Sequence, residues 1–82
     1  MVFSVSAAHA GIWFTGTISK LLVKQDGTVE ITLDDSGTPR WARVSAAGEW
    51  KAFLASALTA QAGGATVRMN YQGGNWVMIE LQ

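Results

Sequence analysis

Apolar and polar residues alternate with a period of two in four segments of this 82-residue chain, and another segment has a helical period. A period of two sends successive side chains to opposite faces of a β-strand, whereas a helix repeats about every 3.6 residues. The alternating segments are residues 12–23, 28–33, 40–45 and 65–71, and a fifth strand-like segment, residues 76–81, is almost continuously apolar. Their number and length predict one small domain, residues 1–82, made mostly of strands.

Glycine-containing turns separate these segments. The Asp-Gly pair in residues 25–27 predicts a hairpin with a type I′ turn, and residues 72–75 predict a second hairpin. Residues 34–39 are polar and end in the only proline, which predicts a loop. Residues 62–64 predict the end of the helix, with a glycine in the left-handed conformation.

Two of the strands depart from simple alternation. In residues 12–23 the apolar phase shifts after Lys20, which predicts a bulge, and Gly16 is a second place where this strand can coil tightly. Residues 76–81 are apolar at nearly every position, with Glu80 as the exception. This run predicts that both faces of the last strand are covered.

The helical segment follows the third strand. Its positions on one helical face are Trp50, Phe53, Leu54, Ala57, Leu58 and Gln61. Ser45 is the predicted N-cap, and Glu49 lies early, where the helix dipole favours a negative charge. The side chains predicted to plug one end of the sheet are Trp50, Phe53, Leu54 and Leu58.

The predicted order of elements is strand, strand, strand, helix, strand, strand. A long bent first strand, two hairpins and a helix before the fourth strand favour an all-β fold with one helix, a five-stranded OB-like β-barrel. The alternative is an open meander with one helix packed across it.

The first ten residues have two interpretations. Residues 2–6 alternate, which favours an additional N-terminal strand. Ala8-His9-Ala10 instead fits the A-x-A pattern of a signal-peptidase site, which would make residues 1–10 a signal-peptide remnant. The protein would then be secreted or periplasmic, and otherwise cytoplasmic. No apolar run approaches the roughly 20 residues needed to span a bilayer.

Residues 15–81 resemble the B subunits of AB5 bacterial toxins, most closely those of the Shiga-toxin type. The similarity is carried by Thr15-Gly16-Thr17-Ile18, the Asp-Gly hairpin, Thr28-Val29-Glu30-Ile31, Trp50, and residues 53–61, 64–70 and 77–81. The resemblance implies an OB barrel, a ring-forming habit and glycan binding. The chain departs from that family because it has no cysteine for the family's disulfide and lacks the acidic hairpin that helps the family bind glycan.

Composition argues against several kinds of site. Six Lys and Arg balance six Asp and Glu, so the chain lacks the net basic charge typical of nucleic-acid-binding domains. With no cysteine and with His9 as the only histidine, it has neither a thiolate metal site nor a recognisable nucleophile–base pair. Asp34 and Asp35 are adjacent carboxylates in the predicted loop and make a weak calcium candidate. We therefore expect a non-enzymatic protein without a metal or cofactor.

Two groups of residues are candidate ligand-binding residues. Trp41 and Arg43 lie two positions apart, so both face the same side of the third strand. A second group on the last hairpin combines aromatic rings with amides, as in sugar-binding sites: Tyr71, Gln72, Asn75 and Trp76. The sequence thus predicts a binding or structural module for carbohydrate or a partner protein. The alternative is an OB domain that stacks the bases of single-stranded nucleic acid on its aromatic rings.

Self-association is the property that composition favours most. Hydrophobic residues make up 49% of the chain and charged residues only 15%, which is more apolar surface than a small core covers. A nearly uncharged final strand at a sheet edge would pair with another chain. We therefore expect a homo-oligomer, and the resemblance implies a ring.

Overall fold

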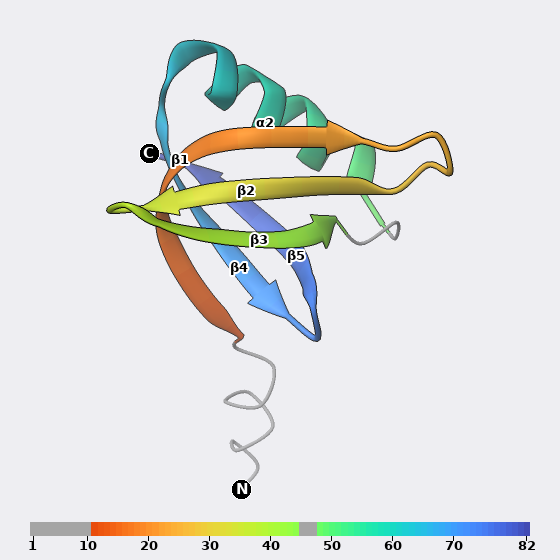
Figure 1. Ribbon diagram of the computed structural model, residues 1–82, viewed down its shortest axis with the longest axis horizontal. Coiled ribbons are helices and arrows are strands. Elements are labelled where there is room, and N and C mark those ends of the chain that lie inside the picture. The colour runs from red at the N-terminus through yellow and green to blue at the C-terminus, as the bar shows by residue number, and fades with distance from the viewer. Residues whose placement is uncertain (1–10, 45–47) are drawn as a thin grey trace, which may run out of the picture.

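The computed structural model describes residues 11–44 and 48–82. The elements are β1 (Ile12–Val23), β2 (Val29–Asp35), β3 (Thr38–Val44), α2 (Trp50–Gly63), β4 (Thr66–Gln72) and β5 (Asn75–Leu81). The strands close into a barrel in the order β1-β2-β3-β5-β4, with α2 at one end (Figure 1). The predicted five-stranded OB-like barrel is confirmed, and the open meander is not formed. The predicted N-terminal strand, the A-x-A pattern and Ser45 lie outside the described residues.

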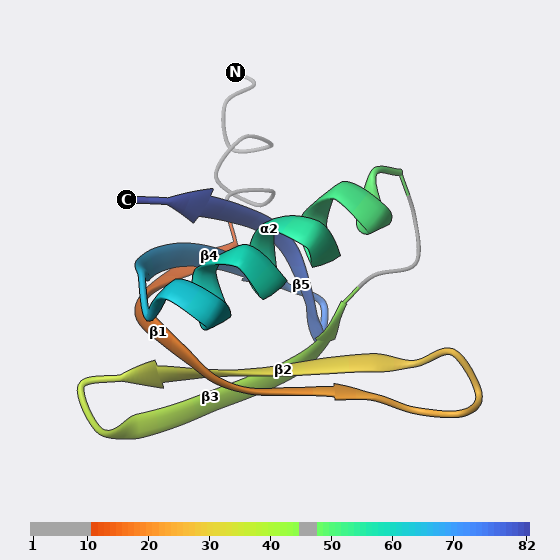
Figure 2. The same ribbon diagram turned by 90° about the horizontal axis from the view of Figure 1, so that it is seen from above.

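Strand β1 belongs to both walls of the barrel (Figure 2). Its first half pairs with β4 and its second half with β2, and Thr17 has a register partner in each, Thr66 and Asp34. A Cβ atom added at Gly16 would collide with the backbone oxygen of Asp34. Glycine is therefore required where β1 passes from one wall to the other. A register shift puts a bulge at Ser19, which confirms the predicted bulge.

The β1–β2 hairpin forms as predicted, but its turn is not type I′. Among the described residues other than glycine only Ser36 has a positive φ, so Asp26 does not take the left-handed conformation that a type I′ turn needs. The Lys24 carbonyl accepts the Gly27 N–H at 3.0 Å, and Gly27 has φ 92°. The loop is therefore one residue longer than a two-residue type I′ hairpin loop, and it needs a positive φ only at Gly27. The Asp26 carboxylate then accepts the Thr28 N–H at 2.9 Å.

The β2–β3 connection is shorter than the predicted loop of residues 34–39. Ser36 and Gly37 both have positive φ, 52° and 94°, and form a tight turn of the primed type. The Asp34 carboxylate accepts the Gly37 N–H at 2.8 Å, which fixes this turn. Strand pairing therefore continues on both sides, and Pro39 lies within β3. Proline is tolerated there because β5 pairs with β3 only from Arg43 onward.

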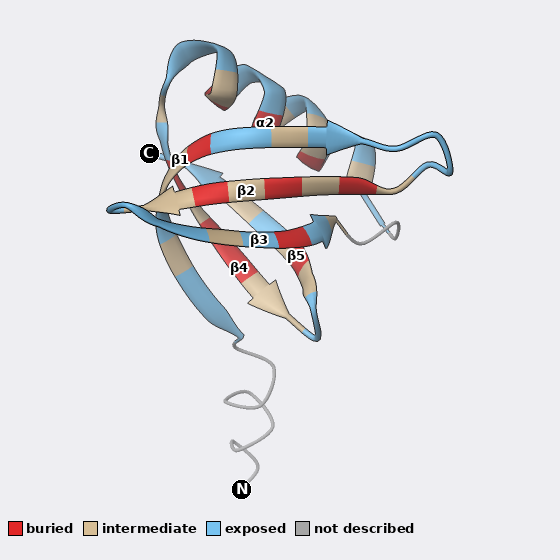
Figure 3. Ribbon diagram, viewed as in Figure 1, coloured by how far each residue is buried: buried red, intermediate tan, exposed pale blue. Residues whose placement is uncertain are grey.

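The core lies between the inner faces of the strands and α2 (Figure 3). The apolar face of the second strand is the inner one, since its three apolar residues are buried: Val29, Ile31 and Leu33. The buried stripe of α2 is Phe53, Ala57 and Ala60. Small alanines let the helix lie close to the barrel, and this orientation turns Leu58 outward. Leu58 is therefore not part of the plug, contrary to the prediction.

The helix ends are only partly as predicted. Gly64 has φ 63° and donates its N–H to the Gln61 carbonyl, so the left-handed glycine at the C-terminus is confirmed. At the other end Glu49 occupies the N-cap position and its side chain makes no capping hydrogen bond.

Strand β5 is not covered on both faces. Met78 and Leu81 are each 45% exposed. Trp76 and Met78 pair with consecutive residues of β4, so Val77 is the extra residue of a bulge. The bulge lets both Trp76 and Ile79 turn inward. Inward-facing positions therefore fall at both even and odd residue numbers along β5, and this change of phase makes the sequence read as a continuous apolar run.

Candidate functional site

A hollow of about 200 Å³ opens at the end of the barrel opposite α2, and we call it the mouth pocket. It is lined by Ile12, Phe14, Arg40, Trp41, Tyr71 and Trp76. The opening exists because β5 pairs with β3 only at Arg43 and Val44, so the first half of β3 has no β5 neighbour. Side chains from β1, β3, β4 and β5 fill the resulting space only in part.

The base of the mouth pocket is a rigid aromatic cluster. Trp76 is 1% exposed, and its indole N–H donates to the Ile31 carbonyl at 2.9 Å. Phe14 and Tyr71 meet the Trp76 ring edge to face, with centroids 6.1 and 5.9 Å away. These contacts fix the three rings, so the pocket is preformed.

Arg40 provides the charged wall of the mouth pocket. Its guanidinium carbon lies 4.8 Å from the centroid of the Phe14 ring, within the range of a cation–π interaction. Its Nε atom lies 3.4 Å from the Asp35 carboxylate. The guanidinium is thus held in place and its charge is compensated.

Trp41 joins the mouth pocket to a second hollow on the outer face of β1, β2 and β3. This outer groove has a volume of about 200 Å³ and is lined by Lys20, Leu22, Glu30, Thr32 and Trp41. Trp41 is 61% exposed, a large value for an indole ring on a strand. One exposed ring therefore borders both hollows.

Most cations around Trp41 are paired with carboxylates. The Glu30 carboxylate forms ion pairs with the Nζ atom of Lys24 at 2.8 Å and with the Nε atom of Arg43 at 3.9 Å. With Arg40 held by Asp35, Lys20 is the cation of this surface that has no ion pair within the described residues. The surface therefore presents hydrogen-bond donors and acceptors held in place by ion pairs, and it has little net positive charge.

The structure brings together part of the predicted binding set. Trp41 and Tyr71 line the mouth pocket, and Arg43 points from the same face of β3 as Trp41 and has Asn75 as its register partner in β5. Gln72 pairs with Asn75 in the β4–β5 hairpin and donates to the Asn70 side chain at 2.9 Å.

Trp76 has a different place from the one predicted. It forms the base of the pocket from within the core and offers no exposed ring face for stacking. The local sequence does not show whether a tryptophan in a strand faces the core or the solvent. Only the barrel geometry shows that Trp76 is buried and Trp41 is exposed.

Sequence reasoning missed Ile12, Phe14 and Arg40 as pocket residues. Ile12 is the register partner of Tyr71, which brings the start of β1 to the end of β4. Ile12 and Phe14 belong to the apolar positions of an alternating segment, but no local pattern tells which end of a barrel remains open.

The weak metal candidates do not come together. The carboxylate of Asp34 accepts the Gly37 N–H and that of Asp35 faces Arg40, because adjacent residues of a strand point to opposite faces. Residues 11–44 and 48–82 contain no group of three or more His, Cys, Asp or Glu that could hold a metal ion. His9 lies outside these ranges. In the same ranges no helix is long and apolar enough to cross a membrane.

Comparison of this chain with protein-family models, with curated proteins and with solved structures gives no match.

Proposed function

We propose that this protein is a non-enzymatic binding module that holds a neutral, chain-like carbohydrate across Trp41, between the mouth pocket and the outer groove. The observation that carries the proposal is the 61% exposure of Trp41 beside two adjoining hollows. Exposed aromatic rings flanked by a few fixed polar groups are typical of ligand sites. The face of the second and third strands is also where OB barrels bind oligosaccharides and oligonucleotides.

The charges around Trp41 favour a sugar over a nucleic acid. Binding of a phosphate chain is driven by cations that are free to replace counterions. Here Lys24, Arg40 and Arg43 already have carboxylate partners. Such pairs suit hydroxyl groups, which need both donors and acceptors. The resemblance of residues 15–81 to glycan-binding toxin B subunits points in the same direction.

A panel of immobilised neutral oligosaccharides, probed with the wild-type protein and with Trp41→Ala, tests the proposal. We expect wild-type binding to at least one oligosaccharide and about tenfold weaker binding by Trp41→Ala, equal to about 1.4 kcal/mol. The matched control is Trp13→Ala, since Trp13 is an exposed tryptophan of β1 that lines neither hollow. Its binding should equal that of wild type.

Single-stranded oligonucleotides in the same assay discriminate the alternative. Binding to oligonucleotides that falls steeply with salt, together with no binding to any oligosaccharide, would replace the carbohydrate proposal by the nucleic-acid one. Equal binding by Trp41→Ala and wild type would remove Trp41 from the site.

A further inference from the structure

One edge of β5 is open beyond Trp76. β5 pairs with β4 along its whole length, but with β3 only at Asn75 and Trp76. No other strand within residues 11–44 and 48–82 pairs with β5. Within residues 11–44 and 48–82, the second half of β5 therefore has no partner on this edge, and such an edge is a surface to which another strand can add.

The register identifies the backbone groups at this open edge. Gln82 donates its N–H to the Thr66 carbonyl in β4 at 3.1 Å. In an antiparallel pair, alternate residues direct their backbone groups to opposite edges. Ile79 and Leu81 therefore direct their N–H and C=O groups away from β4. No backbone bond joins them to another element of the described chain.

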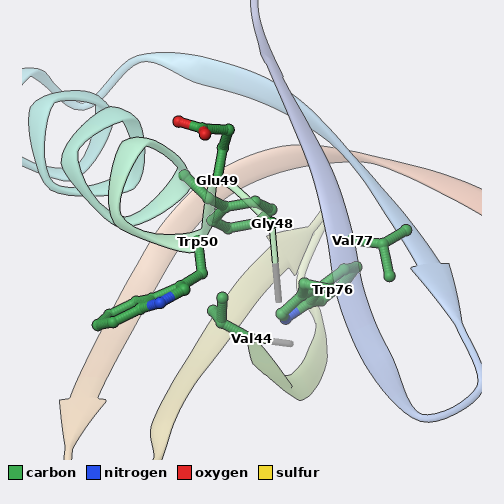
Figure 4. Close-up of a pocket in the computed structure, with 7 residues that line it drawn as sticks. Val44, Gly48, Glu49, Trp50, Trp76 and Val77 are labelled. Carbon is green, nitrogen blue, oxygen red and sulfur yellow. The ribbon is translucent and has the colours of Figure 1, made fainter. Parts of the chain in front are cut away.

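A groove lies along this edge, between β5 and the start of α2. It has a volume of about 510 Å³, and its lining includes Trp13, Phe53, Val77, Met78 and Ile79. A neighbouring hollow of about 340 Å³ shares Glu49, Phe53 and Val77 with it and reaches Trp50 and Val44 (Figure 4). We call the two together the β5 groove. Its floor is apolar, and one side is an unpaired strand.

The lip of the β5 groove is acidic. Glu49 lines both hollows, makes no capping hydrogen bond and has no ion pair within the described residues. Figure 4 draws its carboxylate pointing away from the Trp76 side of the hollow. Glu80 also lines the groove, and Arg68 compensates it at 2.9 Å. Of the described residues that line the groove, Glu49 therefore carries the charge without an ion pair.

We propose that the β5 groove binds an extended segment of a partner polypeptide, which adds to β5 as a further strand. Backbone groups of the segment would bond to Ile79 and Leu81, alternate apolar side chains would contact Phe53 and Met78, and a Lys or Arg would meet Glu49. A second copy of β5 fits less well. Residues 75–81 contain no Lys or Arg, and the copy would bring its own Glu80 toward Glu49.

A synthetic peptide that alternates valine and threonine around one central lysine tests this on the intact protein. We expect the peptide to bind. N-methylation of every second residue should weaken binding about tenfold when the methylated set faces β5, and should leave it unchanged when the other set carries the methyl groups. Equal effects of the two methylated peptides, or no binding by the unmethylated peptide at millimolar concentration, would overturn strand addition.

Two further measurements locate the site and its charge preference. Amide exchange at Ile79 and Leu81 should slow when the peptide binds, while exchange at Met78, whose N–H faces β4, should not change. Glu49→Lys should reverse the preference, so that a peptide with glutamate in place of lysine binds more tightly than the lysine peptide. Glu49 makes no capping bond in wild type, so this variant is expected to fold. Slow exchange at Ile79 and Leu81 without peptide, in a protein that is dimeric by light scattering, would assign the edge to a second copy and overturn the partner assignment.

Discussion

The indole N–H of Trp76 in β5 donates to the backbone carbonyl of Ile31 in β2 at 2.9 Å. These two strands are not neighbours in the sheet, because β3 lies between them. The bond therefore fastens two walls of the barrel to each other through its interior. It also holds the ring that forms the base of the mouth pocket.

Trp76→Phe should destabilise the protein by about 1–3 kcal/mol, because it removes the donor to the Ile31 carbonyl inside the core. Urea unfolding measures the change. Trp41→Phe makes the same chemical change at a 61% exposed position and should alter stability by no more than about 0.5 kcal/mol. Equal losses in the two variants would contradict the core role of Trp76.

Gly16→Ala should destabilise the protein by about 1–3 kcal/mol, because the new methyl group collides with the backbone oxygen of Asp34. The loss is measured as a lower midpoint of thermal or urea unfolding. Gly63→Ala is the matched control, since a Cβ added there meets nothing within 4 Å apart from its chain neighbours and the backbone of its own helix. Alanine has a higher helix propensity than glycine at this last helical position, so the variant should keep the free energy of unfolding or raise it by up to about 1 kcal/mol.

The carboxyl group of Asp26 should titrate below its ordinary value of 3.8, because its ionised form accepts hydrogen bonds from Thr28, and these lower the pKa. A lowered pKa in the folded state stabilises the fold at all pH values above 3.8, and this contribution is lost as the pH falls through the folded-state pKa. Nuclear magnetic resonance titration of the side chain gives the value directly. Asp26→Asn keeps an acceptor oxygen and should remove this part of the acid dependence; an unshifted titration in wild type would show that the bond is not maintained in solution.

Self-association remains a prediction of the sequence, and light scattering at tens of micromolar protein measures it. We expect a mass above that of one chain. Val23 is 61% exposed at the end of β1, on the hairpin that extends beyond the barrel in Figure 1. We expect this hairpin to contribute to the contact, so Val23→Glu should lower the mass. A strict monomer for the wild-type chain would refute the expectation.

Local patterns were sufficient for most of the fold. The alternation of Val29, Ile31 and Leu33 identified a buried face, and Gly64 identified the helix end. The phase shift after Lys20 identified the bulge of β1. Each of these features is determined by neighbours in sequence or by a requirement for a particular backbone conformation.

Features that depend on distant segments were not predictable in the same way. Whether an indole lies inside or outside the barrel depends on the bulge at Val77, which turns Trp76 inward. The helix face that packs depends on how closely the helix can approach the barrel. Ala57 is buried as its place on the predicted face indicates, but Ala60 is buried in place of Leu58. The mouth pocket arises from the short pairing of β3 with β5, which no local sequence pattern indicates.

The double membership of β1 has a consequence for how the chain folds. The β1–β2 hairpin joins segments adjacent in sequence, whereas the pairing of β1 with β4 must wait until β2, β3 and α2 have been synthesised and brought together. Closing such a long intervening loop is entropically costly and slows folding. We expect the docking of β4 on β1 to be the late, rate-limiting event, and the chain to acquire its structure in one cooperative step.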